Sequence, residues 1–326
     1  MVFPILALAV LTSAPETTDV GPLVRALWFV QRHGTSEATI PQNDQRLKGL
    51  LAKAIAKDKL ITINELGGFM DSEAFNKLAG TDSKLDSAEI LEAVEAATPA
   101  SRMKLIPSLR THADYLTTGF DLIDETHRQA GEKLAHWIAS NYVPGKPLHI
   151  IVVCTGNSRR SILGSSMGNL AAAYYGMPEI RFHSGGTAPT AFNSRTVTAL
   201  KAIGFEVEPT GSEAPRGEPK TANPVSRIIW GEGFEATEFS KHYADKVNPQ
   251  QGFAALMVCS EADEGCPFVK GASLRISMPY LDPKIYDDGA YETAKYAERR
   301  DDIGRLMLSV LLQARGELRR RESKAR

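Results

Sequence analysis

The chain is poor in cysteine, in net charge and in long apolar runs, and each shortage excludes a class of protein. Three cysteines in 326 residues cannot form the disulfide framework of a small secreted protein. A formal net charge of −1 provides no overall attraction to nucleic acid or to an anionic membrane. The apolar run within residues 1–14 is too short to span a bilayer. We therefore expect no nucleic-acid partner and no integral membrane span.

What is present is the composition of an ordinary globular protein, with 43% hydrophobic and 24% charged residues. Residues 1–19 form an apolar N-terminus that could be the core of an export signal. No lysine or arginine precedes that run, so the match is weak and a cytoplasmic location is favoured. After it we expect a helical extension over residues 20–100 and a main domain over residues 102–326.

The extension contains two twelve-residue windows that resemble degenerate EF-hand calcium loops. Glu65 and Glu89 stand at the last position of each window, where such a loop places its bidentate ligand. The early ligand positions, which need acids, carry small or apolar residues: Ala54, Ala56, Leu78 and Gly80. Calcium needs six to eight oxygen ligands, so we expect a small helical packing module with no bound metal.

The most informative stretch is residues 149–161, which read HIIVVCTGNSRRS. An apolar, β-branched run over 150–153 predicts a buried parallel strand that leads into a loop and then a helix. Five residues separate Cys154 from Arg160. They are Thr155, Gly156, Asn157, Ser158 and Arg159. A loop of this length can curl so that its backbone N–H groups point inward and bind an anion at the helix N-terminus.

Cys154 would lie at the bottom of that loop as a nucleophile. The helix dipole and Arg160 favour its thiolate, the reactive form. Arg160 can bind two oxygens of a tetrahedral oxyanion at once, which a lysine cannot do in the same geometry. Ser161 can donate a hydrogen bond to the sulfur. The alternative is that Cys154 is an unreactive core thiol at the end of a strand.

Residues 154–161 match the pattern Cys-x-Gly-Asn-x-x-Arg-Ser. At these residues the chain resembles the low-molecular-weight tyrosine phosphatase superfamily, which includes the thioredoxin-coupled arsenate reductases. The resemblance covers residues 120–318 without 206–250. It implies an α/β fold, with a four-stranded parallel sheet flanked by helices and no bound cofactor. It also implies that Asp282, which precedes Pro283, acts as the general acid.

The hydrophobic pattern predicts the elements of this fold along the chain. We expect strands over 148–153, 180–184 and 253–258, and helices over 121–140, 161–175, 193–203 and 290–318. Strand and helix alternating at this spacing favour a parallel sheet with right-handed crossovers. Residues 206–250 are expected to form a hairpin-like insertion, with a strand over 225–230 and a helical stretch near Phe239.

Cys259 and Cys266 lie on a predicted polar loop after the strand 253–258. This placement resembles the arsenate reductase branch. It implies that Cys259 attacks Cys154 after oxyanion transfer and that Cys266 then forms a disulfide with Cys259. A thioredoxin-like partner, acting as external thiol reductant, would reduce that disulfide. The alternatives are a metal pair, for which no well-spaced histidine completes the ligand set, or two inert thiols.

Two positions depart from the pattern of the reductases. Arg159 stands where the family often has cysteine. Ser165 stands where some reductases hold potassium through a glutamate, so we expect no potassium site of that kind. The sequence thus predicts arsenate reduction through a cysteine relay. The alternatives are a phosphatase of phosphotyrosine or small phosphoesters acting through a phosphocysteine, and a non-enzymatic redox-sensing or binding protein.

Overall fold

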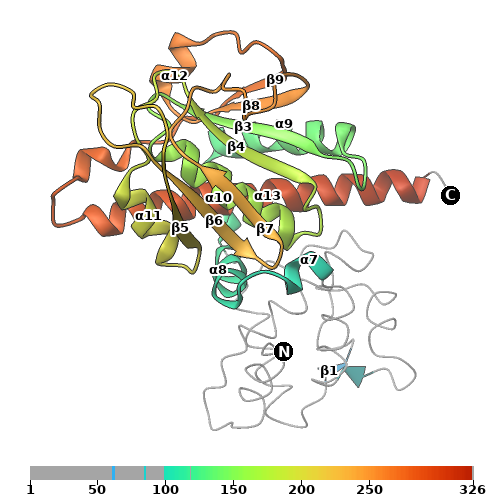
Figure 1. Ribbon diagram of the computed structural model, residues 1–326. Helices are drawn as coiled ribbons and strands as arrows, with labels where there is room; N and C mark the ends of the chain where they lie inside the picture. The colour runs from blue at the N-terminus through green and yellow to red at the C-terminus, as the bar shows by residue number, and fades with distance from the viewer. Residues whose placement is uncertain (1–60, 63–83, 86–98, 118, 325–326) are drawn as a thin grey trace, which may run out of the picture. The chain divides into compact units, whose positions relative to one another are not determined.

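The computed structural model describes residues 61–62, 84–85, 99–117 and 119–324 (Figure 1). The chain divides into two compact units, residues 1–98 and 99–326. In the first unit, strands β1 (Ile61–Thr62) and β2 (Lys84–Leu85) pair antiparallel. Ile61 lies opposite Leu85, so the two calcium-loop-like windows meet at equivalent positions. The predicted export signal and the rest of the extension lie outside the described residues.

A four-stranded parallel sheet forms the centre of the second unit and confirms the predicted α/β fold. Its order is β4 (Ile180–Gly186), β3 (Leu148–Cys154), β8 (Phe253–Met257) and β9 (Ala272–Ser277). Every residue of β8 and all but one of β3 are buried, as expected for central strands covered on both faces. Because all four strands run in one direction, the end of β3 at Cys154 lies beside the ends of β4 and β8.

The helices of the second unit are bounded as follows. They are α7 (Ala100–Met103), α8 (Pro107–Thr117), α9 (Glu125–Asn141), α10 (Arg160–Tyr174), α11 (Ser194–Lys201), α12 (Ser260–Gly265) and α13 (Glu292–Lys324), with 3-10 turns η1 (Phe120–Leu122) and η2 (Pro283–Tyr286). Figure 1 shows α13 as one long helix that crosses the domain. It packs against α8, α9, α10 and α11. Among the described helices, none is long and apolar enough to cross a membrane.

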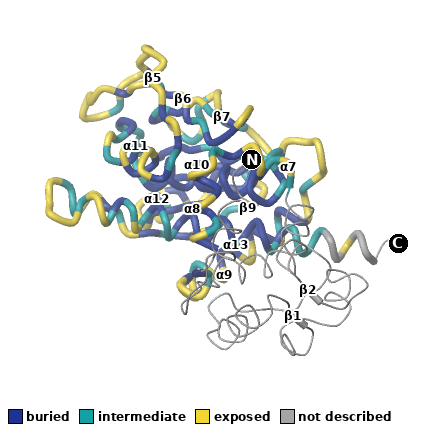
Figure 2. The backbone as a smooth tube through the Cα atoms, turned by 90° about the horizontal axis from the view of Figure 1, so that it is seen from below, coloured by how far each residue is buried: buried dark blue, intermediate teal, exposed yellow. Residues whose placement is uncertain are grey.

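Helix α10 follows the loop of residues 155–159 and is buried along its whole length (Figure 2). Small residues let it lie close to the sheet. A Cβ atom at Gly168 would lie 2.4 Å from the ring of Phe182 on β4, and one at Gly164 would lie 2.7 Å from Val152 on β3. This close packing fixes the N-terminus of α10 relative to the end of β3, and so fixes the loop between them.

The insertion forms a second, antiparallel sheet of β5 (Glu206–Glu213), β6 (Pro224–Gly231) and β7 (Phe234–Glu238). The predicted strand over 225–230 and its following turn are confirmed. The helical stretch expected near Phe239 is wrong, because residues 239–250 contain no helix. There, polar side chains bond nearby backbone groups and compete with helix formation: Asn248 Nδ2 donates to Tyr243 O, and Gln250 Nε2 donates to Asp245 O.

Residues 260–265 also differ from expectation, since the stretch predicted as a polar loop is the short helix α12. Two acids, Glu261 and Asp263, lie in its first turn, where the helix dipole favours negative charge. Cys259 precedes the helix and Cys266 follows it. The two cysteines are therefore held at opposite ends of a folded element.

Candidate active site

The loop between β3 and α10 turns its carbonyl groups outward. Backbone N–H groups of the segment after β4 bind three of them: Ala188 to Thr155 O at 2.9 Å, Thr190 to Gly156 O at 3.0 Å and Asn193 to Ser158 O at 3.4 Å. The backbone N–H groups of residues 156–160 have no acceptor within the described residues. Outward carbonyls and unpaired N–H groups at the start of a helix are the arrangement that binds an anion.

Two residues make this curl possible. Asn157 has a φ of +43°, in the left-handed region that asparagine tolerates better than most residues. Gly186, at the end of β4, faces the loop backbone, and a Cβ there would lie 2.5 Å from Thr155 O. Any larger residue at position 186 would displace the loop.

Cys154 is buried beneath the loop with its sulfur against a hydroxyl. Its Sγ lies 3.1 Å from Ser161 Oγ. Asn157 Nδ2 donates to Ser161 Oγ and to Ser184 Oγ, both at 2.8 Å. Because Ser161 Oγ accepts from Asn157, its own hydrogen is free to point at the sulfur and stabilise a thiolate.

Arg160 connects the loop to the segment that carries the predicted acid. Its Nη1 donates to Tyr280 O and its Nη2 to Asp282 Oδ2, both at 2.8 Å, while Glu261 lies further away at 3.9 Å. Its buried Nε has no acceptor among the described residues. Two of the five guanidinium N–H donors are used in these bonds, so the Nε–H and the second N–H of each Nη are the donors that could bind an oxyanion. Asp282 is itself fixed, since its Oδ1 accepts from Lys284 N at 3.0 Å.

The side chain of Arg159 points away from the loop interior. Its Nε donates to the hydroxyl of Tyr296 at 2.6 Å and its Nη2 to Asp287 Oδ2 at 3.0 Å. Burial, and the hydrogen bond to Asp287, raise the pKa of Tyr296. Arg159 is one of the predicted oxyanion-binding residues, but only its backbone N–H, and not its guanidinium, is available to bind an anion in the loop. Its guanidinium holds the loop against α13.

The structure places Cys259 at the loop and Cys266 away from it. The sulfur of Cys259 accepts the N–H of Thr155 at 3.2 Å and lies 3.4 Å from the Thr155 hydroxyl. Burial raises the pKa of the Cys259 thiol, partly opposed by the Thr155 hydrogen bond. Cys266 instead donates to Phe268 O at 3.3 Å and lies 3.7 Å from the hydroxyl of Tyr243.

Cys259 and Cys266 are not positioned to form a disulfide in this state. All three cysteines are free thiols. A helix rises about 1.5 Å per residue, so α12 separates the Cα atoms of Cys259 and Cys266 by roughly 10 Å. A disulfide needs Cα atoms about 4.4–6.8 Å apart. Helix α12 must therefore unwind before these two thiols can react.

Four residues that support the site were not predicted from the sequence. Tyr280 offers its carbonyl to Arg160, and Ser184, Glu238 and Lys241 form a polar cluster behind Asn157. For Ser184 alone, the sequence offered an indication of this role, because it ends a predicted strand beside the loop. A glutamate three residues before a lysine usually indicates an exposed pair, and nothing local indicates that both are buried.

Among the described residues, no group of three or more histidine, cysteine or acidic side chains is arranged to hold a metal ion. Comparison with known proteins gives no family: no family model matches the chain, and no curated protein is significantly similar to it. The resemblance based on residues 154–161 thus stays a prediction. The chemistry has to follow from the geometry of the loop.

Proposed function

We propose that the site carries out thiolate chemistry on a tetrahedral oxyanion, and that this reaction is the reduction of arsenate to arsenite. One observation carries the proposal. Cys154 lies under a loop of unpaired N–H groups, and Arg160 joins that loop to Asp282 through a 2.8 Å hydrogen bond. A nucleophile, an oxyanion cradle and an acid at one edge of a parallel sheet make an acyl- or phosphoryl-type displacement site.

In the first step the loop N–H groups and Arg160 bind the arsenate oxygens. The thiolate of Cys154 attacks arsenic and forms an S–As bond. The As–O bond to the leaving hydroxyl breaks, and Asp282, which must enter this step as the protonated carboxylic acid, supplies the proton that lets the hydroxyl depart as water. Arsenic stays pentavalent in this step, and negative charge on the remaining oxygens is balanced by Arg160.

In the second step Cys259 reduces the arsenic. Its thiolate attacks Cys154 sulfur and forms an S–S bond, while the electron pair of the S–As bond leaves with arsenic, which departs as arsenite. Cys266 then attacks Cys259 and regenerates the Cys154 thiolate. An external dithiol protein of the thioredoxin type reduces the Cys259–Cys266 disulfide. The contact between Cys259 and Thr155 supports this order of attack.

A phosphatase is the second candidate, and a specific observation favours it. Burial raises the pKa of Cys259, and folded α12 separates it from Cys266, so neither thiol is prepared for rapid relay. Without the relay, Cys154 would form a phosphocysteine with a phosphoester while Asp282 protonates the leaving oxygen. Water would then hydrolyse the intermediate, with Asp282 now accepting a proton.

The deciding experiment compares the wild type with Cys259→Ser. We expect wild type to oxidise NADPH in an arsenate-dependent assay coupled through thioredoxin and thioredoxin reductase, and Cys259→Ser to lose that turnover. Hydrolysis of an aryl phosphate should be the same in both proteins. Cys154→Ser is the control and should reduce either activity by on the order of a thousandfold. Equal phosphoester hydrolysis with no arsenate turnover in wild type would assign the phosphatase.

A further inference from the structure

An ion pair from the insertion is buried directly behind the anion-binding loop. Lys241 Nζ lies 2.5 Å from Glu238 Oε1, and the two side chains are only 4% and 6% exposed. Removing both charges from water carries a large desolvation cost, which the pair must recover through further hydrogen bonds. The conformation of the Glu238–Lys241 pair therefore depends on the other polar groups around the ammonium group.

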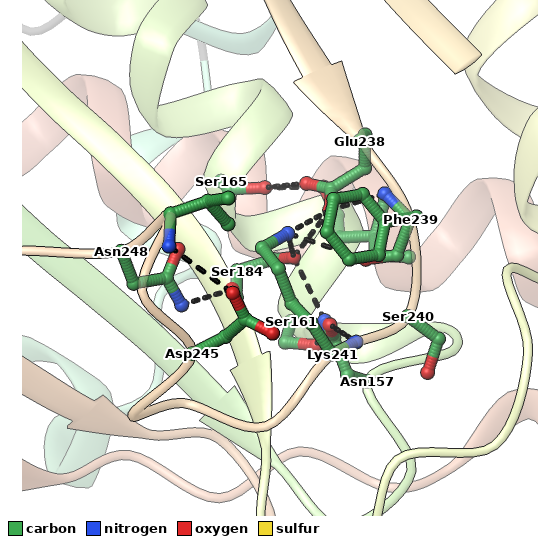
Figure 3. A network of polar contacts seen from close by, with 12 residues as sticks. Asn157, Ser161, Ser165, Ser184, Glu238, Phe239, Ser240, Lys241, Asp245 and Asn248 are labelled. Atoms are coloured by element: carbon green, nitrogen blue, oxygen red, sulfur yellow. Dashed lines mark hydrogen bonds and ion pairs between the residues drawn. The ribbon is translucent and has the colours of Figure 1, made fainter. Parts of the chain in front are cut away.

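The ammonium group lies in a small site lined by oxygen atoms. Besides Glu238, it donates to Ser184 Oγ at 3.3 Å and to Phe239 O at 3.2 Å (Figure 3). The ring of Phe239 covers it at 4.8 Å, an arrangement that favours a cation. A carboxylate, a hydroxyl and a carbonyl are also the groups that coordinate a hard monovalent cation.

This site is connected to Cys154 by a short series of hydrogen bonds. Ser184 Oγ donates to Glu238 Oε1 at 2.7 Å and accepts from Asn157 Nδ2. Asn157 is fixed at its other end by the backbone N–H of Lys241, which donates to Asn157 Oδ1 at 2.8 Å (Figure 3). Asn157 in turn bonds Ser161, whose hydroxyl meets the sulfur of Cys154.

We propose that Lys241 is a positioning residue that provides a built-in cation behind the loop. Its ammonium group orients Ser184 and Glu238, these orient Asn157, and Asn157 holds both the left-handed turn of the loop and Ser161. A loop held in this way needs no external monovalent cation. The role of Lys241 in turnover rests on the proposed function, whereas the cation site itself does not.

The test uses two substitutions that differ in the space they leave. Lys241→Ala removes the ammonium and opens room beside Glu238 for a potassium ion. Lys241→Met removes the charge but fills the room. Each protein is assayed for arsenate and aryl phosphate turnover in potassium chloride and in tetramethylammonium chloride at equal ionic strength, because tetramethylammonium is too large for the site. Thermal unfolding midpoints are measured in the same buffers.

We expect the wild type to be indifferent to the cation. Lys241→Ala should lose at least tenfold in kcat/KM in tetramethylammonium chloride, and potassium should restore most of it. Lys241→Met should lose activity and not regain it. Failure of potassium to restore Lys241→Ala, or potassium dependence in the wild type, would overturn the proposal.

Two further measurements separate a failed proposal from a failed fold or a wrong function. Potassium should raise the unfolding midpoint of Lys241→Ala but not of Lys241→Met, whether or not the wild type turns over either substrate. The double variant Glu238→Gln/Lys241→Met leaves neither charge of this buried pair, so we expect it to fold even where the single variants, which leave Glu238 unpaired, do not. Full activity in that double variant would also overturn the proposal.

Discussion

At the scale of single residues, Arg160 has the most demanding role. Its Nη1 holds Tyr280 O and its Nη2 holds Asp282, while its buried Nε has no acceptor among the described residues. A planar guanidinium can hold both partners and still offer further N–H donors, whereas an ammonium is a single point of charge. The positions of the loop and of Asp282 therefore depend on one side chain, and so does the oxyanion binding that we propose.

Arg160→Lys should thus be a severe change. We expect kcat/KM to fall by about 10²–10³, the typical effect of losing one oxyanion donor, with steady-state kinetics as the measurement. Arg159→Lys is the matched control, because its guanidinium binds Asp287 and Tyr296 instead of the loop interior. A loss in Arg159→Lys as large as that in Arg160→Lys would contradict the assignment of Arg160.

Some residues of the site could be predicted from the sequence, and others could not. Cys154, Arg160 and Ser161 lie within one short motif, so their proximity was predictable from spacing alone. Asp282 was predictable only through the family resemblance, and the structure brings it to Arg160. Lys241 lies 84 residues from Asn157 along the chain, and only the folded insertion brings them together. Contacts of that range leave no local pattern.

At the scale of elements, helix α12 controls whether the thiols can meet. Arg275 on β9 holds this helix at two points: Nη2 donates to Asp263 Oδ1 in its first turn at 2.6 Å, and Nε donates to the O of Cys266 after its last residue at 3.1 Å. Ser277 Oγ donates to the other oxygen of Asp263 at 2.6 Å. These bonds oppose the unwinding that a Cys259–Cys266 disulfide requires.

Arg275→Met should therefore speed formation of that disulfide. Losing hydrogen bonds of a charged group costs about 1.5–3 kcal/mol, so we expect oxidation by excess oxidised dithiothreitol to be roughly tenfold faster. The measurement is the loss of free thiols with time. Arg227→Met serves as control, since Arg227 pairs with Glu208 on the second sheet. Equal rates in Arg275→Met and wild type would mean that this contact does not limit the opening of α12.

The elements that were predicted incorrectly share a physical cause. Both α12 and residues 239–250 are polar stretches, where hydrophobic periodicity is absent and local hydrogen bonds decide the structure. The buried strands β3 and β8 and the helix α10 carry strong apolar patterns. Their predicted positions agree with the structure within a few residues.

At the scale of the whole molecule, a histidine pair in the parallel sheet makes stability depend on pH. His149 Nδ1 lies 3.0 Å from His183 Nε2. Burial, and then the neighbouring His149, lower the pKa of His183 from 6.5 to about 3. As pH falls below 6.5, the unfolded chain takes up a proton at His183 that the folded chain refuses, so stability decreases; above 6.5 the effect vanishes.

We expect the free energy of unfolding to fall by about 2 kcal/mol from this group between pH 6.5 and 5, since one pKa unit corresponds to about 1.4 kcal/mol. Urea unfolding at a series of pH values measures the slope. His183→Gln cannot titrate and should show a shallower slope over the same range. Parallel slopes in the two proteins would show that His183 is protonated in the folded state.

The loop between Cys154 and Arg160 is made by the ribosome before the parts of the chain that hold it. Cys154 and its loop emerge first, Lys241 follows much later, and Asp282 and the helix α13 come after that. A nascent chain adds its structure from the N-terminus onward. During synthesis Cys154 is thus an ordinary thiol, without the folded loop above it. The site that we propose is complete only once α13 has been made, and an interrupted chain lacks it.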